Sequence, residues 1–342
     1  MESNSAIKNK YLEEKQQLFA FSIVIPSHNR KEQLSRALGY VAALNYPAEF
    51  LEVVVMLDGC TDGSAQMLKE LAETFPFKLS WVEQKQGGPS AARNAGVLKA
   101  ANEYILFLDD DVMCTSNLVQ EHYQSHLAHP DTVVVGTMSK PEDSRGPVWV
   151  RWEEALLERQ YQDIIRGRYK FTARQFYTGN CSLKREWIIK AGMFDETFKR
   201  YEDVELAYRL AQLNLTFEFN PAAIGYHYPK RSFKSWVNMH YLYGRYAVKI
   251  DRDKGSLDMI NITKTEFQDR NKITQLLAGL LLNHKTLQTI FVYTFMRLAQ
   301  LAGALKQDRV ASQLLSSVAN VLYWQGFNDE LNLNSKATPN FL

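Results

Sequence analysis

Three short apolar runs, each followed by a helical pattern, constrain the fold more than any other feature of this sequence. FSIVIP (residues 21–26), LEVVVML (residues 51–57) and YILFL (residues 104–108) are rich in β-branched or aromatic side chains, which is typical of buried strands. A further strand is expected at residues 78–83, and helices are expected at residues 31–43, at residues 65–74 and up to residue 100. This alternation predicts an α/β fold, with a mostly parallel sheet covered by helices on both faces.

The pattern changes along the rest of the chain. Residues 131–228 mix short strands, loops and helices, and the clearest helical pattern among them covers residues 204–213. From about Ser232 onward, the apolar residues follow helical spacing and no convincing strand pattern occurs. We therefore expect three parts: an N-terminal extension at 1–20, an α/β domain at 21–230 and a helical C-terminal region at 231–342.

The composition is that of an ordinary globular protein. A hydrophobic fraction of 46% excludes wholesale disorder. The net charge of +2 gives no electrostatic reason to expect nucleic acid as a partner. Cys60, Cys114 and Cys181 are scattered and none forms a CxxC pair, so neither a disulfide framework nor a zinc site is expected. These features indicate a reducing, cytoplasmic compartment.

No stretch of the sequence is typical of a membrane span or a signal peptide. The polar N-terminus lacks the apolar centre of a signal peptide. The most apolar stretch, residues 287–305, is interrupted by Gln288, Arg297 and Gln300. Because an arginine near the centre of a span is costly, a packed helix or a helix lying on the inner face of the membrane is expected instead.

An acidic triplet, Asp109-Asp110-Asp111, stands at the end of the third apolar run. In open parallel sheets, ligands bind beyond the carboxyl ends of the strands. Alternation along an extended chain would point Asp109 and Asp111 to the same side, where two carboxylates can hold a hard divalent cation. A solvated acidic turn is the alternative, but three adjacent negative charges repel unless something positive compensates them.

A glycine-rich loop opens the helix that precedes this strand. Gly87-Gly88-Pro89-Ser90 leads into a run of small residues that contains Arg93. The N–H groups of a helix N-terminus bind phosphate, and arginine adds a permanent positive charge. Gly-Pro-Ser is also an ordinary helix start. Together, the loop and the triplet predict a site for a metal-chelated diphosphate.

Five motifs, in order and with their spacing, make the sequence resemble glycosyltransferase family 2. They are SIVIPSHNR, LDGCTDGS, GGPSAARNAG with LFLDDDV, TGNCSLKRE, and FKRYEDVEL. The resemblance covers residues 21–228, about two thirds of the chain. It implies the GT-A fold, a Rossmann-like, mostly parallel sheet flanked by helices, here with a helical C-terminal region. It also implies an inverting enzyme that uses a nucleotide-diphosphate sugar.

The resemblance implies a nucleotide-binding role for five residues. Pro26 and the loop after it would line the nucleoside pocket together with Asp58. Arg93 would lie near the nucleotide, and Asp109 would face the ribose. Asp110 belongs to the same nucleotide-binding set.

The resemblance also implies the metal and the catalytic groups. Asp111 would bind Mn²⁺ or Mg²⁺ between the two phosphates, and His227 would be an additional metal or phosphate contact. Asp203 would be the general base that accepts the proton of the acceptor hydroxyl, with Glu202 supporting it. These roles agree with the chemistry, because negative charge develops on the departing diphosphate while the acceptor loses a proton.

Purely structural roles would also account for several of these residues. Glu202 and Asp203 begin a helix, where acidic side chains are favoured by the dipole. His227 could be a packed histidine between two tyrosines. Cys181 is expected to be a small packed residue. Three histidines at roughly helical spacing are expected to be structural: His122, His126 and His129.

Two departures from the family pattern narrow the expected function. Leu57 stands where many members carry a first acid before Asp58, which puts the nucleobase contacts in doubt. The QxxRW motif of processive members is absent after the ED motif (Glu202-Asp203). We therefore expect one sugar per encounter, from a UDP-sugar, to the hydroxyl of a glycan or a lipid-linked acceptor. A sugar nucleotidyltransferase and a non-catalytic nucleotide-sugar-binding module are the alternatives.

Overall fold

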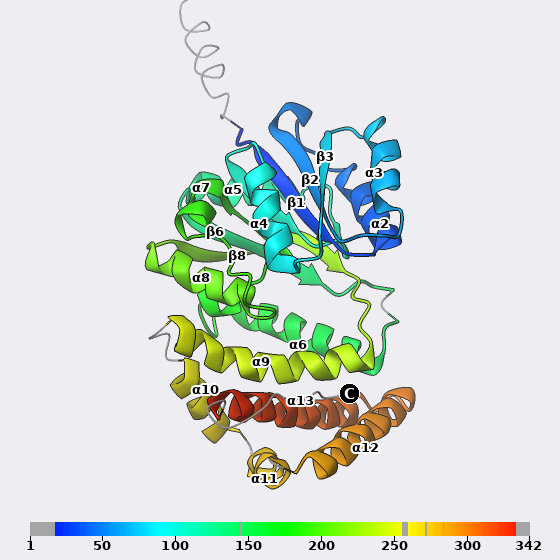
Figure 1. Ribbon diagram of the computed structural model, residues 1–342, viewed down its shortest axis with the longest axis vertical. Coiled ribbons are helices and arrows are strands. Elements are labelled where there is room, and N and C mark those ends of the chain that lie inside the picture. Colours follow the sequence, from blue (N-terminus) through cyan, green and yellow to red (C-terminus); the bar gives the residue numbers. More distant parts are fainter. Residues whose placement is uncertain (1–17, 144, 255–258, 271, 283, 333–342) are drawn as a thin grey trace, which may run out of the picture.

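The computed structural model contains one eight-stranded mixed sheet with helices on both faces (Figure 1). The structure describes residues 18–332 apart from 144, 255–258, 271 and 283. The strands are β1 (Phe21–Ser27), β2 (Leu51–Asp58), β3 (Lys78–Gln84), β4 (Tyr104–Leu108), β5 (Val112–Cys114), β6 (Thr132–Ser139), β7 (Asn180–Lys184) and β8 (Thr216–His227). The four strands expected in the first third of the chain are confirmed.

The order of the strands is β3-β2-β1-β4-β7-β6-β8-β5. The first four are parallel to one another, whereas β7 runs antiparallel to both β4 and β6. β5 follows the acidic triplet and runs antiparallel to the end of β8, so that Val112 lies opposite His227. The expected α/β architecture, with a mostly parallel sheet, is confirmed.

Among the described residues of the first two thirds, seven α-helices flank the sheet. They are α2 (Lys31–Val41), α3 (Ser64–Ala72), α4 (Pro89–Lys99), α5 (Leu118–Ala128), α6 (Val148–Ile165), α7 (Arg185–Lys190) and α8 (Glu202–Gln212), and short 3₁₀ turns occur at Ala48–Phe50 and Ala173–Gln175. Glycine supplies the turn before α4, where Gly88 has a φ of 94°, a conformation that costs glycine little.

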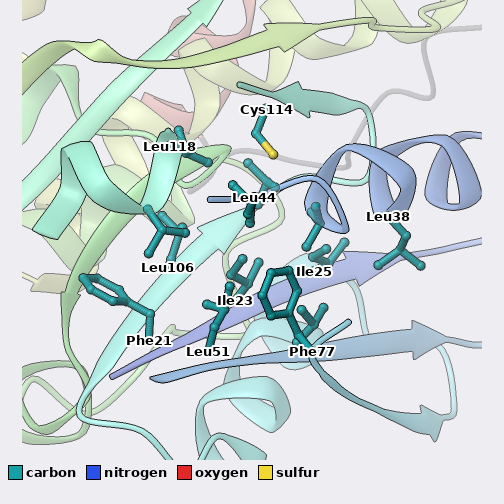
Figure 2. Close-up of a cluster of buried hydrophobic side chains, with 14 of the residues drawn as sticks. Phe21, Ile23, Ile25, Leu38, Leu44, Leu51, Phe77, Leu106, Cys114 and Leu118 are labelled. Atoms are coloured by element: carbon teal, nitrogen blue, oxygen red, sulfur yellow. The ribbon is translucent and has the colours of Figure 1, made fainter. Parts of the chain in front are cut away.

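The apolar side chains of the sheet form two cores, one on each face. Along β1, Ile23 and Ile25 point to one face and Val24 to the other, as the two-residue period of a strand requires. The first core packs against α2, α3 and α5, and Figure 2 shows it around Ile23, Ile25 and Leu38. The second core packs against α4, α7 and α8. A sheet buried on both faces explains why its strands read as continuous apolar runs.

The C-terminal region is helical, as the sequence predicts. Its helices are α9 (Phe233–Lys254), α10 (Met259–Gln268), α11 (Lys272–Leu281), α12 (Lys285–Ala304) and α13 (Asp308–Leu331). α9 and α13 cross at two glycines: a Cβ on Gly244 would overlap the carbonyl of Tyr323, and a Cβ on Gly326 would overlap that of Tyr241. Figure 1 shows the sheet followed by α9, then α13, with α11 and α12 at the far end of the molecule.

The histidines of α5 have a structural role, as expected. His122 and His126 are buried and hydrogen-bond to Asn180 and Ser182 on β7. Burial lowers the pKa of His122 to about 4 and that of His126 to about 3, so both rings are neutral at physiological pH. His129 lies exposed at the end of α5.

None of the helices in the described part of the chain is long and apolar enough to cross a membrane. α12 is the helix formed by the apolar stretch that the sequence singles out, and one of its sides packs on α13 through residues such as Phe291, Val292 and Met296.

Candidate active site

The candidate site is at the carboxyl edge of β2, β1 and β4, which lie side by side in the sheet (Figure 1). β1 ends at Ser27 and the loop after it carries Arg30, β2 ends at Asp58, and β4 leads into the acidic triplet. Because these strands are parallel, their carboxyl ends meet at one edge. The topology therefore gathers motifs that are far apart in the sequence, at about one strand-to-strand spacing from each other.

The acidic triplet forms a turn between β4 and β5. The expected alternation of its carboxylates does not apply, because β4 ends at Leu108 before the triplet begins. Asp110 accepts hydrogen bonds from Ser27 Oγ (2.7 Å) and Arg30 Nη1 (2.8 Å). Asp111 accepts one from the same Arg30 nitrogen at 2.9 Å. Asp109 turns to a different partner, Arg93.

Arg30 is a residue of the candidate site that motif reasoning missed. Its guanidinium joins Asp110 to Asp111 and supplies part of the positive charge that three adjacent carboxylates require. The sequence held one signal for it, because Arg30 follows the first strand and the carboxyl ends of parallel strands share an edge. Burial would lower the pKa of Arg30, but the charges of Asp110 and Asp111 raise it overall.

His227 lies beside the triplet rather than in the core. Its Nε2 is 3.5 Å from Asp111 Oδ1, and the backbone N–H of the next residue, Tyr228, donates to the carbonyl of Asp111 at 2.8 Å. The antiparallel pairing of β5 with β8 causes this contact. His227 is therefore a residue of the site, and a purely structural role as a packed core histidine is not needed to account for it.

The two buried carboxylates of the triplet differ in their acidity. Burial would raise the pKa of Asp111, but the hydrogen bond and charge of His227, with the charge of Arg30, hold it below its usual value. Burial raises the pKa of Asp110 to about 6, with the charge of Arg30 opposing the shift and that of Asp111 adding to it. Asp111 is therefore the more firmly ionised of the two.

The donor atoms of Asp111 and His227 fit a divalent cation of the Mn²⁺ type. Carboxylate oxygen and imidazole nitrogen are both suitable ligands for such ions. No group of three or more His, Cys, Asp or Glu side chains arranged to hold a metal occurs among the described residues. The protein thus offers a partial ligand set, of the kind that substrate phosphates and water complete.

Asp58 and the glycine-rich loop form one unit. Asp58 accepts hydrogen bonds from the backbone N–H groups of Gly87 (2.7 Å) and Gly88 (2.8 Å), and from Gln84 Nε2 (2.8 Å). Its carboxylate therefore positions the loop that begins α4. Pro26, near the end of β1, lies opposite Met56 of β2 in the register. The nucleoside contacts of Pro26 and Asp58 stay predictions.

Arg93 connects the triplet to the ED motif. It is buried on α4, with Nη2 3.0 Å from Asp109 Oδ1 and Nη1 3.3 Å from Glu202 Oε1. One planar guanidinium thus brings together carboxylates that are 93 positions apart (202 − 109). Burial would lower the pKa of Arg93, but the charges of Asp109, Glu202 and Asp203 raise it overall. The two acidic motifs therefore belong to one site.

The ED motif begins α8, so its acids also benefit from the helix dipole. Tyr201, which precedes it, has a φ of 62°, which is unusual for a residue with a large side chain. Loss of water around Asp203 and the charge of Glu202 raise the pKa of Asp203 to about 7. A carboxyl with this pKa is suited to accept a proton near neutral pH. Glu205, by contrast, pairs with Arg209 (2.5 Å) inside the fold.

A cavity of about 300 Å³ lies on the helical side of the ED motif. Tyr201 lines it, together with Trp152 and His240. Among the described residues, the indole N–H of Trp152 and Nε2 of His240 are buried without hydrogen-bond partners. Burial lowers the pKa of His240 to about 3, so its ring is neutral. The cavity is therefore lined in part by aromatic side chains.

Cys181 of β7 and Glu153 of α6 have structural contacts near the candidate site. Cys181 is buried on β7, and burial raises the pKa of its thiol well above the usual value, so it is a packed residue, as expected. Glu153 of α6 is 3.2 Å from Nε of Arg231.

Comparison with known proteins gives consistent matches. Residues 22–192 match the family model described as glycosyl transferase family 2. The chain is 26% identical over 253 residues to the uncharacterized glycosyltransferase YfnE of Bacillus subtilis, covering 60% of this chain and 64% of that protein. It is 28% identical over 214 residues to the validoxylamine A glucosyltransferase of Streptomyces hygroscopicus subsp. jinggangensis, covering 55% and 50%. The chain thus spans less than two thirds of either relative.

Two solved structures share the fold over nearly the whole chain. The mannosyltransferase of Pyrobaculum calidifontis, in complex with GDP-Man and Mn²⁺, superposes with a TM-score of 0.60 at 17% identity, covering 95% of this chain and 93% of that one. TarS 1–349 of S. aureus, in complex with UDP, superposes with a TM-score of 0.53 at 15% identity, covering 94% of each chain.

Proposed function

Because this chain belongs to glycosyl transferase family 2, we propose that it transfers one sugar from a nucleotide-diphosphate sugar to an acceptor hydroxyl, with inversion at the anomeric carbon. The observation that carries this proposal is the position of Arg93 between Asp109 and Glu202. This position supports the proposal, because Glu202 is next to the proposed general base Asp203 and Asp109 lies at the edge proposed to bind the diphosphate. The two halves of a transfer reaction, departure of the diphosphate and deprotonation of the acceptor, therefore have adjacent residues to serve them.

On the donor side, the nucleotide lies along the edge formed by Pro26, Asp58 and the glycine-rich loop. The backbone N–H groups at the start of α4 and the positive charge of Arg93 would favour the negative charge of the diphosphate. Asp109 orients the ribose, and Asp110 supports Asp111 through their common partner Arg30. These groups hold the diphosphate in one orientation, so that the anomeric carbon faces the acceptor.

Asp111, with His227, holds a divalent cation in this proposal, Mn²⁺ or Mg²⁺. Such an ion supplies positive charge where the departing diphosphate becomes more negative. Support for the cation comes from the ligand types of Asp111 and His227. The structural neighbour from Pyrobaculum calidifontis is described as a complex with Mn²⁺.

On the acceptor side, Asp203 takes the proton. The hydroxyl oxygen attacks the anomeric carbon, its O–H proton moves to the Asp203 carboxylate, and the bond from the anomeric carbon to the diphosphate breaks. The bonding electrons leave with the diphosphate. Because attack and departure occur on opposite faces, the configuration inverts. Glu202 and Arg93 set the charge around Asp203.

The donor we propose is a UDP-sugar, and the acceptor a glycan or a lipid-linked molecule. Neighbouring structures are described with UDP and with GDP-Man, which supports a nucleotide-sugar donor of either base. The cavity beside Tyr201 is a suitable place for the acceptor, because sugars pack on aromatic rings and hydrogen-bond at their edges. Residues 21–230 would form the transferase domain, and residues 231–342 would shape the acceptor side. Transfer is non-processive and occurs in the cytoplasm.

A donor panel tests this proposal. The protein is incubated with UDP-, GDP- and dTDP-sugars and Mn²⁺ or Mg²⁺, and the released nucleotide is separated and measured. Release from one donor class that disappears in Asp203→Asn is the expected result. Nucleotide binding without release from any donor would contradict the proposal and favour a non-catalytic binding module. Formation of a nucleotide sugar from a nucleoside triphosphate and a sugar phosphate would favour a nucleotidyltransferase.

A further inference from the structure

α12 is apolar on two opposite sides, although only one of them packs against the protein. Phe291, Val292 and Met296 are buried against the helical core. The opposite side carries four large apolar residues at helical spacing, Leu287, Ile290, Leu298 and Leu301, and Leu305 follows directly after the helix. A helix that is apolar all round is normally buried all round. The exposed side of α12 is therefore an unusual surface for a globular protein.

The side chains of these residues are well exposed and not half-buried. Ile290 and Leu301 are each 57% exposed, and Leu305 is 63% exposed. Leu276 (62% exposed) and Leu280 on α11 belong to the same end of the molecule, which Figure 1 shows as the end farthest from the first strands of the sheet. We call these seven residues the apolar end face. Scattered surface leucines are ordinary, but a grouped set of this kind marks an interaction site.

The charged residues of this stretch of the chain have one sign, and Asp308 at the start of α13 is the first acidic residue after it. From Lys272 to Gln307 the chain contains no aspartate or glutamate. The same stretch contains Lys285 at the start of α12, Arg297 beside the leucine row and Lys306 just after the helix ends, and all three are exposed. The charged residues of the whole chain are nearly balanced, with a net charge of +2, so the absence of acidic residues here is a local property.

We propose that the apolar end face is a docking surface for an anionic lipid bilayer, on which α12 lies parallel to the membrane. A row of leucines with basic residues at its edges is the pattern of a helix that lies in the interface. The leucine side chains would enter the boundary between headgroups and acyl chains. The basic side chains would reach the lipid phosphates, extending their stems along the apolar surface. No described helix is suited to span a membrane, so the contact is peripheral.

This surface is remote in sequence from the donor and base residues, so membrane docking and sugar transfer can fail independently. Docking on a membrane would keep the enzyme beside membrane-bound acceptors, and this consequence rests on the proposed function. The docking proposal itself does not depend on the proposed function.

Vesicle sedimentation of the full chain tests the proposal. The protein is mixed with vesicles of phosphatidylcholine alone, or of phosphatidylcholine with phosphatidylglycerol, and the pelleted fraction is measured. We expect binding to the anionic vesicles, weaker binding to the neutral ones, and partial release at high salt, because salt screens the charges but not the apolar contact. Protein that stays in the supernatant with both vesicle types would overturn the proposal.

Substitutions at two exposed positions of α12 test the apolar contact directly. Leu298→Glu with Leu301→Glu removes two leucines from the membrane-facing row without touching the packed side of α12. We expect the partition constant on anionic vesicles to fall at least about tenfold, because the variant loses two apolar side chains and gains two negative charges that the anionic lipids repel. Leu98→Glu is the matched control, because Leu98 is 62% exposed on α4, far from this face in the sequence. It should bind vesicles as the wild type does.

Two further measurements distinguish membrane docking from a folding defect and from self-association. Nucleotide release from a soluble donor should be the same in the double variant and the wild type, which shows that the variant is folded. Light scattering after size exclusion gives the oligomeric state. If the wild type is a dimer that the double variant separates, and vesicle binding is the same in both, the face is an interface between two copies and the membrane proposal is wrong.

Discussion

Arg93 is the residue on which the geometry of the candidate site depends most. Its guanidinium contacts Asp109 and Glu202 in two directions, which the planar fork of arginine allows and the single ammonium of lysine does not. Arg93→Lys should therefore lower the transfer rate by about 10²-fold or more, as the loss of an electrostatic group in an active site commonly does. Steady-state assays of the purified variant measure this.

The control for this substitution is Arg168→Lys. Arg168 pairs with Asp163 on the exposed surface, where ion pairs contribute little, so neither the rate nor the melting temperature should change. Equal rates for Arg93→Lys and the wild type would show that Arg93 has no part in the reaction.

The proton affinity of Asp203 predicts the pH dependence of the rate. Loss of water and the neighbouring Glu202 raise the pKa of Asp203 to about 7. A general base must be ionised, so kcat/KM should fall on the acidic side with a midpoint near pH 7. Glu202→Gln removes the like charge and should move this midpoint to lower pH. A profile whose acidic limb is unchanged in Glu202→Gln would argue that another group is titrating.

The same pKa has a consequence for stability. Because the folded pKa of Asp203 lies above its ordinary value of 3.8, this proton stabilises the fold below about pH 4, and the contribution is lost as the pH rises through about 7. Asp203→Asn removes the ionisation. The melting temperature of this variant, relative to the wild type, should therefore be higher at pH 8 than at pH 4. A melting-temperature difference that is the same at pH 4 and pH 8 would contradict this.

Residue types and motif order predicted most of the site, but the contacts between the residues were beyond sequence reasoning. The triplet, Arg93 and the ED motif were chosen from their sequence neighbours, and the structure brings them together. Arg30 was missed because its contacts depend on the turn after Leu108, which directs both Asp110 and Asp111 to the Arg30 guanidinium. The register of β5 against β8, which brings His227 to Asp111, has no signal in the residues themselves.

At the scale of elements, buried strands were predicted best. β1, β2 and β4 are apolar throughout because both faces of the sheet are covered. β8 was not predicted in detail, because most of its residues are only partly buried and it contains Pro221, which is typical of an irregular or edge strand. The antiparallel placement of β7 between β4 and β6 was also not predicted, since strand order depends on long-range packing.

The crossing of α9 and α13 gives a test at this scale. A Cβ on Gly326 would overlap the backbone of Tyr241, so Gly326→Ala should lower the free energy of unfolding by about 1–3 kcal/mol, as overpacking does. Gly279→Ala, in α11, is the matched control, since a Cβ there meets no atom within 4 Å. It should raise stability by up to about 1 kcal/mol, because alanine favours the helix. Chemical denaturation measures both. Equal effects of the two substitutions would argue against a close crossing.

At the scale of the whole molecule, the helical C-terminal region lies beside the sheet and its flanking helices (Figure 1). The sheet gathers at one edge the motifs that we propose bind the nucleotide, and its long-range pairings bring Asp111, Arg93 and the ED motif into one candidate site. The helical region adds the cavity beside Tyr201 and the apolar end face. We expect that single substitutions can impair donor binding and proton transfer separately.

Calorimetry of nucleotide binding with Mn²⁺, combined with a transfer assay on the same samples, tests this expectation most directly. Asp111→Asn should lose the metal-dependent part of nucleotide binding and the activity together. Asp203→Asn should bind nucleotide and metal as the wild type does and lose about 10²–10⁴-fold in rate, the usual contribution of a general base. Full activity in Asp203→Asn, or unchanged metal-dependent binding in Asp111→Asn, would contradict the account.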